Sequence, residues 1–450
     1  MSMKRLPRLA ARAAASVMLA LLAACGGGGL PTSADECSVA SQQSWLGERM
    51  REWYFWRLLA PNPDPTASGS VAAYFEALLY KGGNPAFPAD RWSHHEPSSQ
   101  FERYYGEGRT LGYGMSVSGL EVVGEPAKPL RVRHVEALSD AAAQGIRRGD
   151  EVLSLDGRSS ADIVAANDFS LLSAGQEGQR LSIELRDAAG VRRSIVLTAS
   201  VYALTPVTAP RIVTSAAGRR LGYVAVKDMV TQALPGIEAT FASLRAAGVD
   251  DLVLDLRYNG GGLVSVAAAL ASHAVGARTS GAVFAQLLYN DQRAAVNNRS
   301  YDFTRPAAAL GLPRVFVLSA RRTCSASEQV INGLKPFAEV VLIGETSCGK
   351  PVGTLPVSHC AVTYSAINFE SVNARLEGRY FDGFAPACAV ADDLSRALGD
   401  PDEALLAAAR HYADQGSCPS GTAWRASPLQ QRARPEHKPD GGGHQAMIAR

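Results

Sequence analysis

Between residues 203 and 413, short apolar runs of strand length alternate with segments of helix length. The runs at 221–226, 251–256, 313–318 and 340–343 are each followed by a helix-like or turn-rich stretch. Two parallel strands need a crossover connection, usually a helix, so this alternation is typical of a layered α/β core with parallel pairing. We predict such a core for this region.

The length and composition restrict the class of protein further. With 450 residues, 46% hydrophobic and 20% charged, the chain is of globular composition and has room for two or three domains. The charges of the 45 basic and 43 acidic residues nearly cancel, so the chain lacks the excess positive charge typical of a nucleic-acid-binding protein. The only unbroken apolar run is N-terminal, which excludes a multi-span membrane protein.

The first residues have the pattern of a targeting segment. A basic stretch precedes the apolar run 13–24, which is too short to span a bilayer. The run ends in Leu-Ala-Ala-Cys at Cys25, which resembles the bacterial lipobox. We predict a lipoprotein signal peptide (1–24), a tether (25–36), and a lipid anchor on Cys25 that faces the periplasm. Gly26 in place of an aspartate favours the outer membrane; a buried first helix is the alternative.

The remaining cysteines fit an exported protein. Besides Cys25 there are six, an even number that suits disulfides in an oxidising compartment. No two of them have the C-x-x-C spacing of a metal site, and only Cys360 has an adjacent histidine, His359. We expect no metal and no cofactor.

Three further regions differ in pattern from the core. Region 37–105 is predicted to be helical, and its aromatic residues are expected to form a packed core rather than a ligand-binding face. Region 106–202 has short strands separated by glycines. Region 414–450 has no periodicity and is predicted to be a disordered tail. The residues at helical spacing are Trp45, Met50, Trp53, Tyr54 and Trp56, of which all but Met50 are aromatic.

The second region resembles a PDZ domain. The match lies in the small helix and the Gly-Asp…Asp-Gly hairpin between 139 and 157. Tyr113, Gly114 and Met115 stand where that family has its carboxylate-binding loop. The resemblance implies capture of a peptide C-terminus, with the peptide added to a strand edge. A PDZ-shaped spacer that binds nothing is the alternative.

Two segments of the core have the residues for nucleophilic catalysis. Ser325 and Lys350 both follow strands, at the sheet edge where α/β folds build their sites. A serine hydroxyl attacks only when a base takes its proton, and lysine is a base only when neutral. The pKa of lysine must therefore fall from about 10.4 to about 7, which requires a dry pocket.

The motifs around these two residues resemble the C-terminal processing peptidases, also called tail-specific proteases. The matches are Ser-Ala-Ser-Glu at 325–328, Gly-Lys at 349–350, and Asp-Leu-Arg-Tyr-Asn-Gly-Gly-Gly at 255–262. The resemblance implies that Ser325 is the nucleophile and Lys350 the general base. It also implies an oxyanion hole of backbone N–H groups, formed by Ala326 together with Gly260 or Gly261.

The third catalytic residue departs from the family pattern. Many members have a glutamine after the lysine, whereas this chain has Thr354 at the matching position. Glu328, three residues after the nucleophile, is the alternative that some members use. The extra cysteines and the helical N-terminal region suggest a lipoprotein branch of the family.

The expected protein is therefore an α/β multidomain chain with a helical N-terminal region, a PDZ-like β domain and a layered α/β peptidase core. Its expected function is that of a lipoprotein serine endopeptidase, which cleaves protein or peptide substrates near a free C-terminus captured by the PDZ-like domain. A non-catalytic scaffold that tethers peptides at the membrane is the alternative.

The catalytic residues also suggest a disulfide arrangement. Cys324 and Cys348 stand beside Ser325 and Lys350, so a serine and lysine within reach would bring the two sulfurs near bonding distance. We predict that Cys324 pairs with Cys348. The remaining pairs would then be Cys360–Cys388 and Cys37–Cys418. For Cys324 and Cys348 the alternative is that both are small buried thiols.

Overall fold

The computed structural model describes residues 36–420, 440 and 446–449. The predicted signal peptide, Cys25 and nearly all of the tether lie outside the described residues. Among the helices of the described part, none has the length and apolarity needed to cross a membrane.

The N-terminal region packs its aromatic side chains into a core of its own. Tyr54 and Trp56 are almost completely buried, and Trp56 packs against Tyr80, Phe87 and Trp92. The same cluster contains Val352, Tyr364 and Ile367, which belong to the third region of the chain. The prediction of a packed aromatic core is therefore confirmed. The elements are α2 (Val39–Trp53), η1 (Pro65–Ala67), α3 (Val71–Leu78), β1 (His94–Pro97), α4 (Ser98–Phe101) and η2 (Glu102–Gly106).

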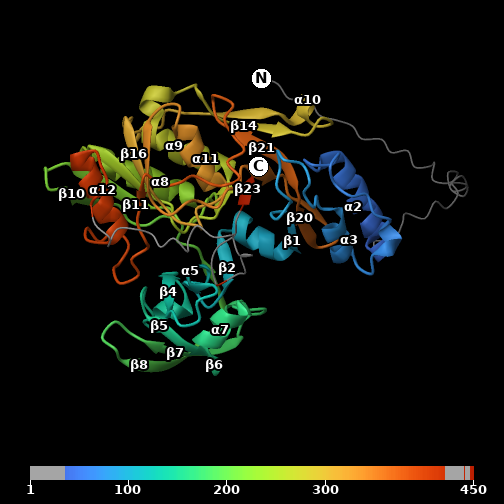
Figure 1. The fold of residues 1–450 in the computed structure, drawn as a ribbon, viewed down its shortest axis with the longest axis horizontal. Coiled ribbons are helices and arrows are strands. Elements are labelled where there is room, and N and C mark those ends of the chain that lie inside the picture. Colours follow the sequence, from blue (N-terminus) through green and yellow to red (C-terminus); the bar gives the residue numbers. More distant parts are fainter. Residues whose placement is uncertain (1–35, 421–439, 441–445, 450) are drawn as a thin grey trace, which may run out of the picture.

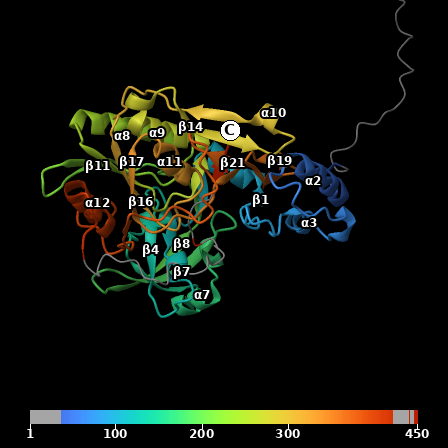
Figure 2. The ribbon, with the colours of Figure 1, turned by 45° about the horizontal axis from the view of Figure 1, so that its top comes forward.

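A small β domain lies below the rest of the molecule in both views (Figures 1 and 2). Its sheet has the order β3-β4-β5-β7-β8, with β6 beside β5, and it encloses a separate hydrophobic core. The pair β2–β9 closes the domain where the chain enters and leaves it. The elements are β2 (Arg109–Gly112), β3 (Met115–Val117), α5 (Gly119–Val122), β4 (Leu130–Val135), α6 (Asp140–Ala143), β5 (Glu151–Leu155), β6 (Arg158–Ser159), α7 (Ser160–Ala166), η3 (Ser170–Leu172), β7 (Arg180–Arg186), β8 (Arg192–Thr198) and β9 (Ser200–Ala203).

The third region is the predicted layered α/β core. Its main sheet has the order β10-β11-β12-β16-β17-β22, parallel throughout except for β10. Along β12, Leu252 and Leu254 face helices α8, α9 and α11, whereas Val253 faces α12. Both faces of the sheet are thus buried, as parallel sheets require. The elements are β10 (Arg211–Thr214), β11 (Arg220–Ala225), α8 (Ala233–Ala247), β12 (Asp251–Asp255), α9 (Val264–Thr279), β16 (Arg314–Ser319), α11 (Ala326–Leu334), β17 (Glu339–Gly344), β22 (Cys388–Ala389) and α12 (Ala404–Gln415).

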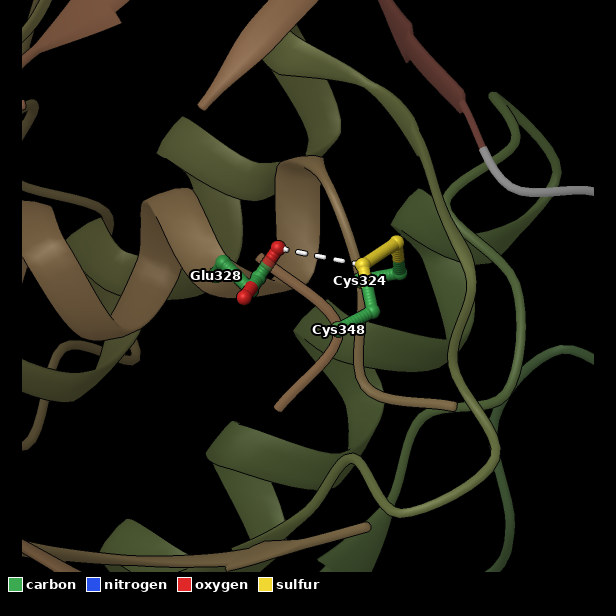
Figure 3. A group of neighbouring side chains, drawn as sticks. All are labelled: Cys324, Glu328 and Cys348. Carbon is green, nitrogen blue, oxygen red and sulfur yellow. Dashed lines mark hydrogen bonds between the residues drawn. A yellow bond between two sulfur atoms is a disulfide. The ribbon is translucent and has the colours of Figure 1, made fainter. Parts of the chain in front are cut away.

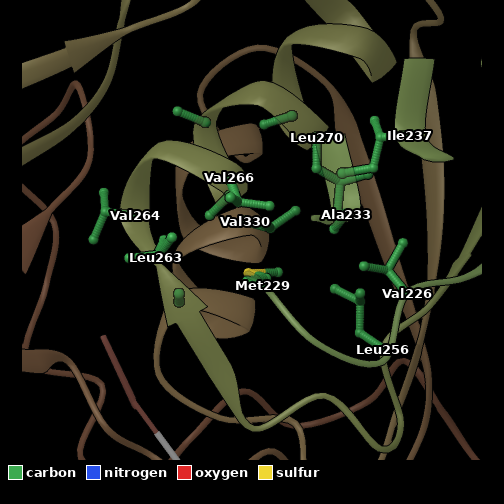
Figure 4. Close-up of a cluster of buried hydrophobic side chains, with 14 of the residues drawn as sticks. Val226, Met229, Ala233, Ile237, Leu256, Leu263, Val264, Val266, Leu270 and Val330 are labelled. Atoms are coloured by element: carbon green, nitrogen blue, oxygen red, sulfur yellow. The ribbon is translucent and has the colours of Figure 1, made fainter. Parts of the chain in front are cut away.

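A second sheet lies beside the core helices, in the order β13-β23-β18-β21-β14-β15. Figure 4 shows part of this region, where Leu263 of β13 lies near Val264 and Val266 of α9 in the same buried cluster. A separate three-stranded sheet has the order β1-β20-β19, in which β20 pairs with β1 of the N-terminal region on one side and with β19 on the other. The elements are β13 (Gly261–Leu263), β14 (Val283–Tyr289), α10 (Ala294–Asn297), β15 (Arg299–Asp302), β18 (Val352–Thr354), β19 (Val357–His359), β20 (Val362–Ser365), β21 (Ile367–Val372) and β23 (Ala446–Ile448).

Strand β23 corrects the prediction of a disordered tail over 414–450. Residues 446–449 are buried in the main core cluster, and β23 pairs with β13 and β18. Four apolar residues are too few to show a strand period in the sequence. These residues form a strand because β13 and β18 pair with them on either side, and not because of their own β propensity.

Candidate active site

Ser325 stands at the start of α11 in a strained conformation. Its φ is +63°, which a non-glycine residue rarely adopts, and it is completely buried. The Ser325 hydroxyl has no hydrogen-bond partner among the described residues. A buried hydroxyl without a partner is costly, and such exceptions call for an explanation. The strained turn places Ser325 at the N-terminal end of helix α11, which is the positive end of the helix dipole.

Lys350 lies in the turn after β17 and is only 1% exposed. Burial lowers the pKa of Lys350 to about 8, although the charges of Asp90 and Glu328 raise it. A buried ammonium is disfavoured because it loses its hydration. A lysine that acts as a base has to be buried and to have a lowered pKa, and Lys350 meets both requirements.

Glu328 holds the serine turn and the lysine turn together. Its Oε2 accepts hydrogen bonds from the backbone N–H groups of Ser325 at 2.9 Å and Lys350 at 2.8 Å. Its Oε1 accepts from the Gly349 N–H at 2.7 Å and from the Ser347 hydroxyl at 2.6 Å. Burial raises the pKa of Glu328 above its ordinary value, while these hydrogen bonds lower it. Glu328 thus positions the two turns through their backbones.

A disulfide links the same two turns. Cys324 and Cys348 are bonded with their Cα atoms 5.1 Å apart, so the predicted pair is confirmed (Figure 3). The Cys348 N–H also donates to the Thr323 carbonyl at 3.0 Å. The two sulfurs and the Glu328 carboxylate lie within 4.8 Å of one another, a spacing that would suit a metal ion. Sulfurs joined in a disulfide are not thiolate ligands, so this cluster is a covalent brace.

The other two predicted pairs are wrong. Cys37 is bonded to Cys360, and Cys388 to Cys418. Helix α2 packs on the hairpin of β19 and β20, where Trp45 stacks on His359, which brings Cys37 next to Cys360. No local spacing in the sequence indicates this contact.

We expect alanine at both Cys324 and Cys348 to lower the free energy of unfolding by about 3 kcal/mol and to reduce peptidase activity. The matched control is alanine at both Cys388 and Cys418, because that disulfide closes a loop of similar length, with a separation of 30 residues against 24. Denaturant unfolding should give similar losses for both variants, whereas only the first should lose activity at a temperature where both are folded. Equal activity in the two variants would contradict the role of the brace.

The glycine turn lies directly against the start of α11. Gly261 has a φ of +103°, and a Cβ at this position would lie 2.8 Å from Ala326 N and 2.9 Å from the Cys324 carbonyl oxygen. No larger residue fits there. The Gly261 N–H already donates to Asn259 Oδ1 at 2.8 Å. Of the two predicted glycines, Gly260 is therefore the better candidate to complete an oxyanion hole with Ala326.

Thr354, the other predicted third residue, ends strand β18. It is buried, and its carbonyl accepts a hydrogen bond from the Ala449 N–H at 3.1 Å. Its main chain pairs with Ile448 of β23. These contacts of Thr354 are thus with the neighbouring strand β23, whereas Glu328 is the residue that contacts both turns.

The predicted peptide-binding loop lies in the small β domain, apart from the residues around Ser325. Tyr113 and Met115 are buried, and the Cβ of a residue at Gly114 would lie 1.8 Å from Ser139 Cβ. The carbonyls of Tyr113 and Gly114 accept hydrogen bonds from the N–H groups of Ala141 and Glu136. The loop is therefore packed tightly against the segment 136–141.

Asn259 organises the catalytic turns, a role that the sequence argument did not assign. Its side chain donates to the Val226 carbonyl at 2.8 Å and accepts from the Gly261 N–H. Its carbonyl accepts from the Cys324 N–H at 3.1 Å and the Ser327 hydroxyl at 3.0 Å. Its place inside the Arg-Tyr-Asn-Gly motif was the available signal.

Arg257, two residues earlier, was also missed. It is completely buried and binds Glu403 through two nitrogens, at 2.7 and 2.9 Å, together with Asp255 and Asp392 at 2.9 Å. Next to it, the Tyr258 hydroxyl donates a hydrogen bond to Asp392 and accepts one from Arg148, which belongs to the small β domain. The buried contacts of Arg257 hold the residues before the glycine turn in place, and Tyr258 connects the turn to the small β domain.

These features define a serine-hydrolase type of site, and the comparisons with known proteins agree. Residues 220–370 match peptidase family S41, and residues 41–94 match the S41 N-terminal domain. A carboxyl-terminal-processing protease of Synechocystis sp. is 24% identical over 244 residues, which cover 54% of this chain and 53% of that protein. The chloroplastic C-terminal processing peptidase of Tetradesmus obliquus is 28% identical over 220 residues, 47% of this chain and 45% of that one. The chain spans about half the length of the curated relatives it matches.

Solved structures give the same fold. An S41 protease from Bacteroides fragilis NCTC 9343 matches with a TM-score of 0.66 at 23% identity, over 83% of this chain and 97% of that one. A photosystem II D1 C-terminal processing protease matches with a TM-score of 0.52 at 19% identity, over 79% and 93%. At such identities the likeness shows the fold alone. The core and the N-terminal region of this chain are therefore similar to peptidase family S41, a family of serine peptidases.

Proposed function

We propose that this chain is a serine endopeptidase in which Ser325 is the nucleophile and Lys350 the general base. The observation that carries the proposal is that Ser325 N and Lys350 N donate to the same oxygen of Glu328. This shared acceptor holds the backbones of the two residues together, and both side chains are buried, which supports the assignment. The lowered pKa of Lys350, about 8, supplies a substantial neutral fraction near neutral pH.

The reaction follows from this geometry. Neutral Lys350 takes the proton of the Ser325 hydroxyl, and the oxygen attacks the carbonyl carbon of a peptide bond. The negative oxygen that forms accepts hydrogen bonds from the N–H groups of Ala326 and Gly260. Lys350 then gives its proton to the leaving amine, and water hydrolyses the ester on Ser325 with Lys350 again as base.

The substrates that we propose are proteins or peptides cleaved near a C-terminus. The names of the relatives, carboxyl-terminal-processing proteases, support this substrate class. We further propose that the small β domain is PDZ-like and takes up the substrate, and that Cys25 anchors the protein in the outer membrane, facing the periplasm. Arg148 of the small β domain contacts Tyr258 beside the glycine turn, and this contact supports a role of the domain in substrate uptake.

Incubation of the purified protein and of Ser325→Ala with a denatured reporter tests the function. The reporter carries a series of C-terminal tails, and cleavage sites are read by mass spectrometry. We expect the wild-type protein to release C-terminal fragments, and Ser325→Ala to release them more slowly by roughly a thousandfold or more. Binding of the tails by both proteins without cleavage by either would support a non-catalytic scaffold instead.

A further inference from the structure

A short segment of the chain itself fills a slot, one strand wide, between strands β13 and β18. Strand β23 lies between β13, which continues the glycine turn, and β18, which follows Lys350. The Ala446 N–H donates to the Gly260 carbonyl at 3.0 Å, and the Ala449 N–H donates to the Thr354 carbonyl at 3.1 Å. Both walls of the slot are backbone edges that any extended peptide could pair with.

The segment reaches the reacting centre. The ideal Cβ position of Gly261 lies 2.2 Å from the Ala446 carbonyl oxygen and 2.8 Å from Ala326 N. A carbonyl of β23 therefore lies beside the proposed oxyanion donor Ala326. The Met447 side chain is completely buried in the main core cluster. This is the place that a substrate strand would have to occupy.

A second contact lies six positions earlier in the chain, at Asp440. Its side chain is completely buried between Arg133 of the small β domain and Arg322, three residues before Ser325. The Asp440 carboxylate also accepts from the N–H groups of Gly119 at 3.1 Å and Leu120 at 3.3 Å. Its carbonyl accepts from the Val117 N–H, at the free edge of β3, at 3.0 Å. One carboxylate is thus bound by two arginines and two backbone N–H groups.

We infer that residues 440 and 446–449, the resident segment, occupy the path of the substrate and keep the enzyme inhibited until a substrate displaces them. The inference rests on the proposed function. It also assigns a substrate class: an extended peptide with an acidic side chain for Arg133 and Arg322 and, about six residues later, small and apolar residues for the slot. Arg133 and Arg322 are then the residues that select the acidic side chain.

The first test releases the resident segment in the full-length chain. In Met447→Asp a charge would have to be buried in the slot, so the strand should leave it. We expect its kcat/KM on a reporter peptide to rise by at least about tenfold, the factor expected if the segment occupies the slot nine-tenths of the time. The control is Val296→Asp, since Val296 is 81% exposed and should cleave at the wild-type rate. A folded Met447→Asp protein with the wild-type rate would overturn the inference.

The second test needs no catalysis. A fluorescein-labelled peptide of residues 436–450 is titrated into the full-length Ser325→Ala, Met447→Asp protein, and binding is read by fluorescence anisotropy. We expect saturable binding of the native peptide, binding weaker by about tenfold or more for a peptide with Asp440→Asn, and none for a peptide with Met447→Asp. Equal binding of all three peptides would overturn the inference.

The two tests separate this inference from the proposed function. Peptide binding in the expected order, with no cleavage by any variant, would refute the peptidase and leave the resident segment as an occupant of the slot. Cleavage by the wild-type protein, with no peptide binding and no activation by Met447→Asp, would support the peptidase and refute the inhibitory role of the resident segment. The full-length variant Asp440→Asn provides a milder release, and Asp402→Asn is its control because the Asp402 side chain is 72% exposed.

Discussion

Replacing Lys350 with arginine should abolish proteolysis, and replacing it with methionine should do the same. A guanidinium remains protonated in proteins and cannot take the proton of Ser325. Methionine fills a similar volume in the buried site and has no basic nitrogen. We expect both variants to lose roughly a thousandfold or more in kcat/KM on a reporter peptide. Cleavage by Lys350→Arg at the wild-type rate would refute Lys350 as the base.

The pH dependence gives a second measurement on the same residue. Because the base must be neutral and its pKa is about 8, wild-type activity should rise with pH and reach half its maximum near that value. The pKa is lower in the folded than in the unfolded protein, so the unfolded state binds more protons between about 8 and the ordinary value of 10.5. The free energy of unfolding should therefore rise with pH over this window. In Lys350→Met that rise should be absent.

Replacing Arg257 with methionine should give the largest loss of stability. The change leaves Asp255, Asp392 and Glu403 without the cation at their centre, and of these only Asp392 is partly exposed, at 11%. Breaking a buried ion cluster from one side costs about 3–5 kcal/mol, far more than the net value of the intact pairs. We expect a loss of this size in denaturant unfolding.

Activity should fall together with stability in Arg257→Met, because Arg257 fixes the base of the glycine turn. The matched control is Arg396→Met, which removes a 45% exposed arginine that pairs with Asp400 and Asp402. Exposed pairs contribute about 0–1 kcal/mol, so this variant should unfold almost as the wild type does. Equal losses in the two variants would contradict the structural role of the buried cluster.

The parts of the molecule that could be predicted from sequence are those that depend on neighbours in the chain. The strand and helix alternation of the core follows from local apolar runs. The positions of Ser325 and Lys350 follow from turns after strands, and the Cys324–Cys348 pair follows from those positions. Family resemblance added the roles of these residues, which spacing alone does not give.

The parts that were missed depend on contacts between distant segments. Arg257 meets Asp392 and Glu403, which lie 135 and 146 residues later in the chain. Strand β23 is ordered by β13 and β18 on its two sides, and four apolar residues show no period of their own. The pairing of Cys37 with Cys360 depends on where α2 packs, and cysteine counting leaves that open.

The Cys37–Cys360 disulfide closes a covalent ring, with a sequence separation of 323, that contains Ser325 and Lys350. A nick in any loop between the two cysteines would leave both fragments joined, so the cleaved protein would separate on a gel only after reduction. The ring also imposes an order on assembly, since synthesis delivers Cys37 long before its partner. Cys324 and Cys348 both emerge during that wait, so Cys37 must avoid two wrong partners before the right one exists. The N-terminal helices can therefore be fastened to the enzyme only after both catalytic turns have been made.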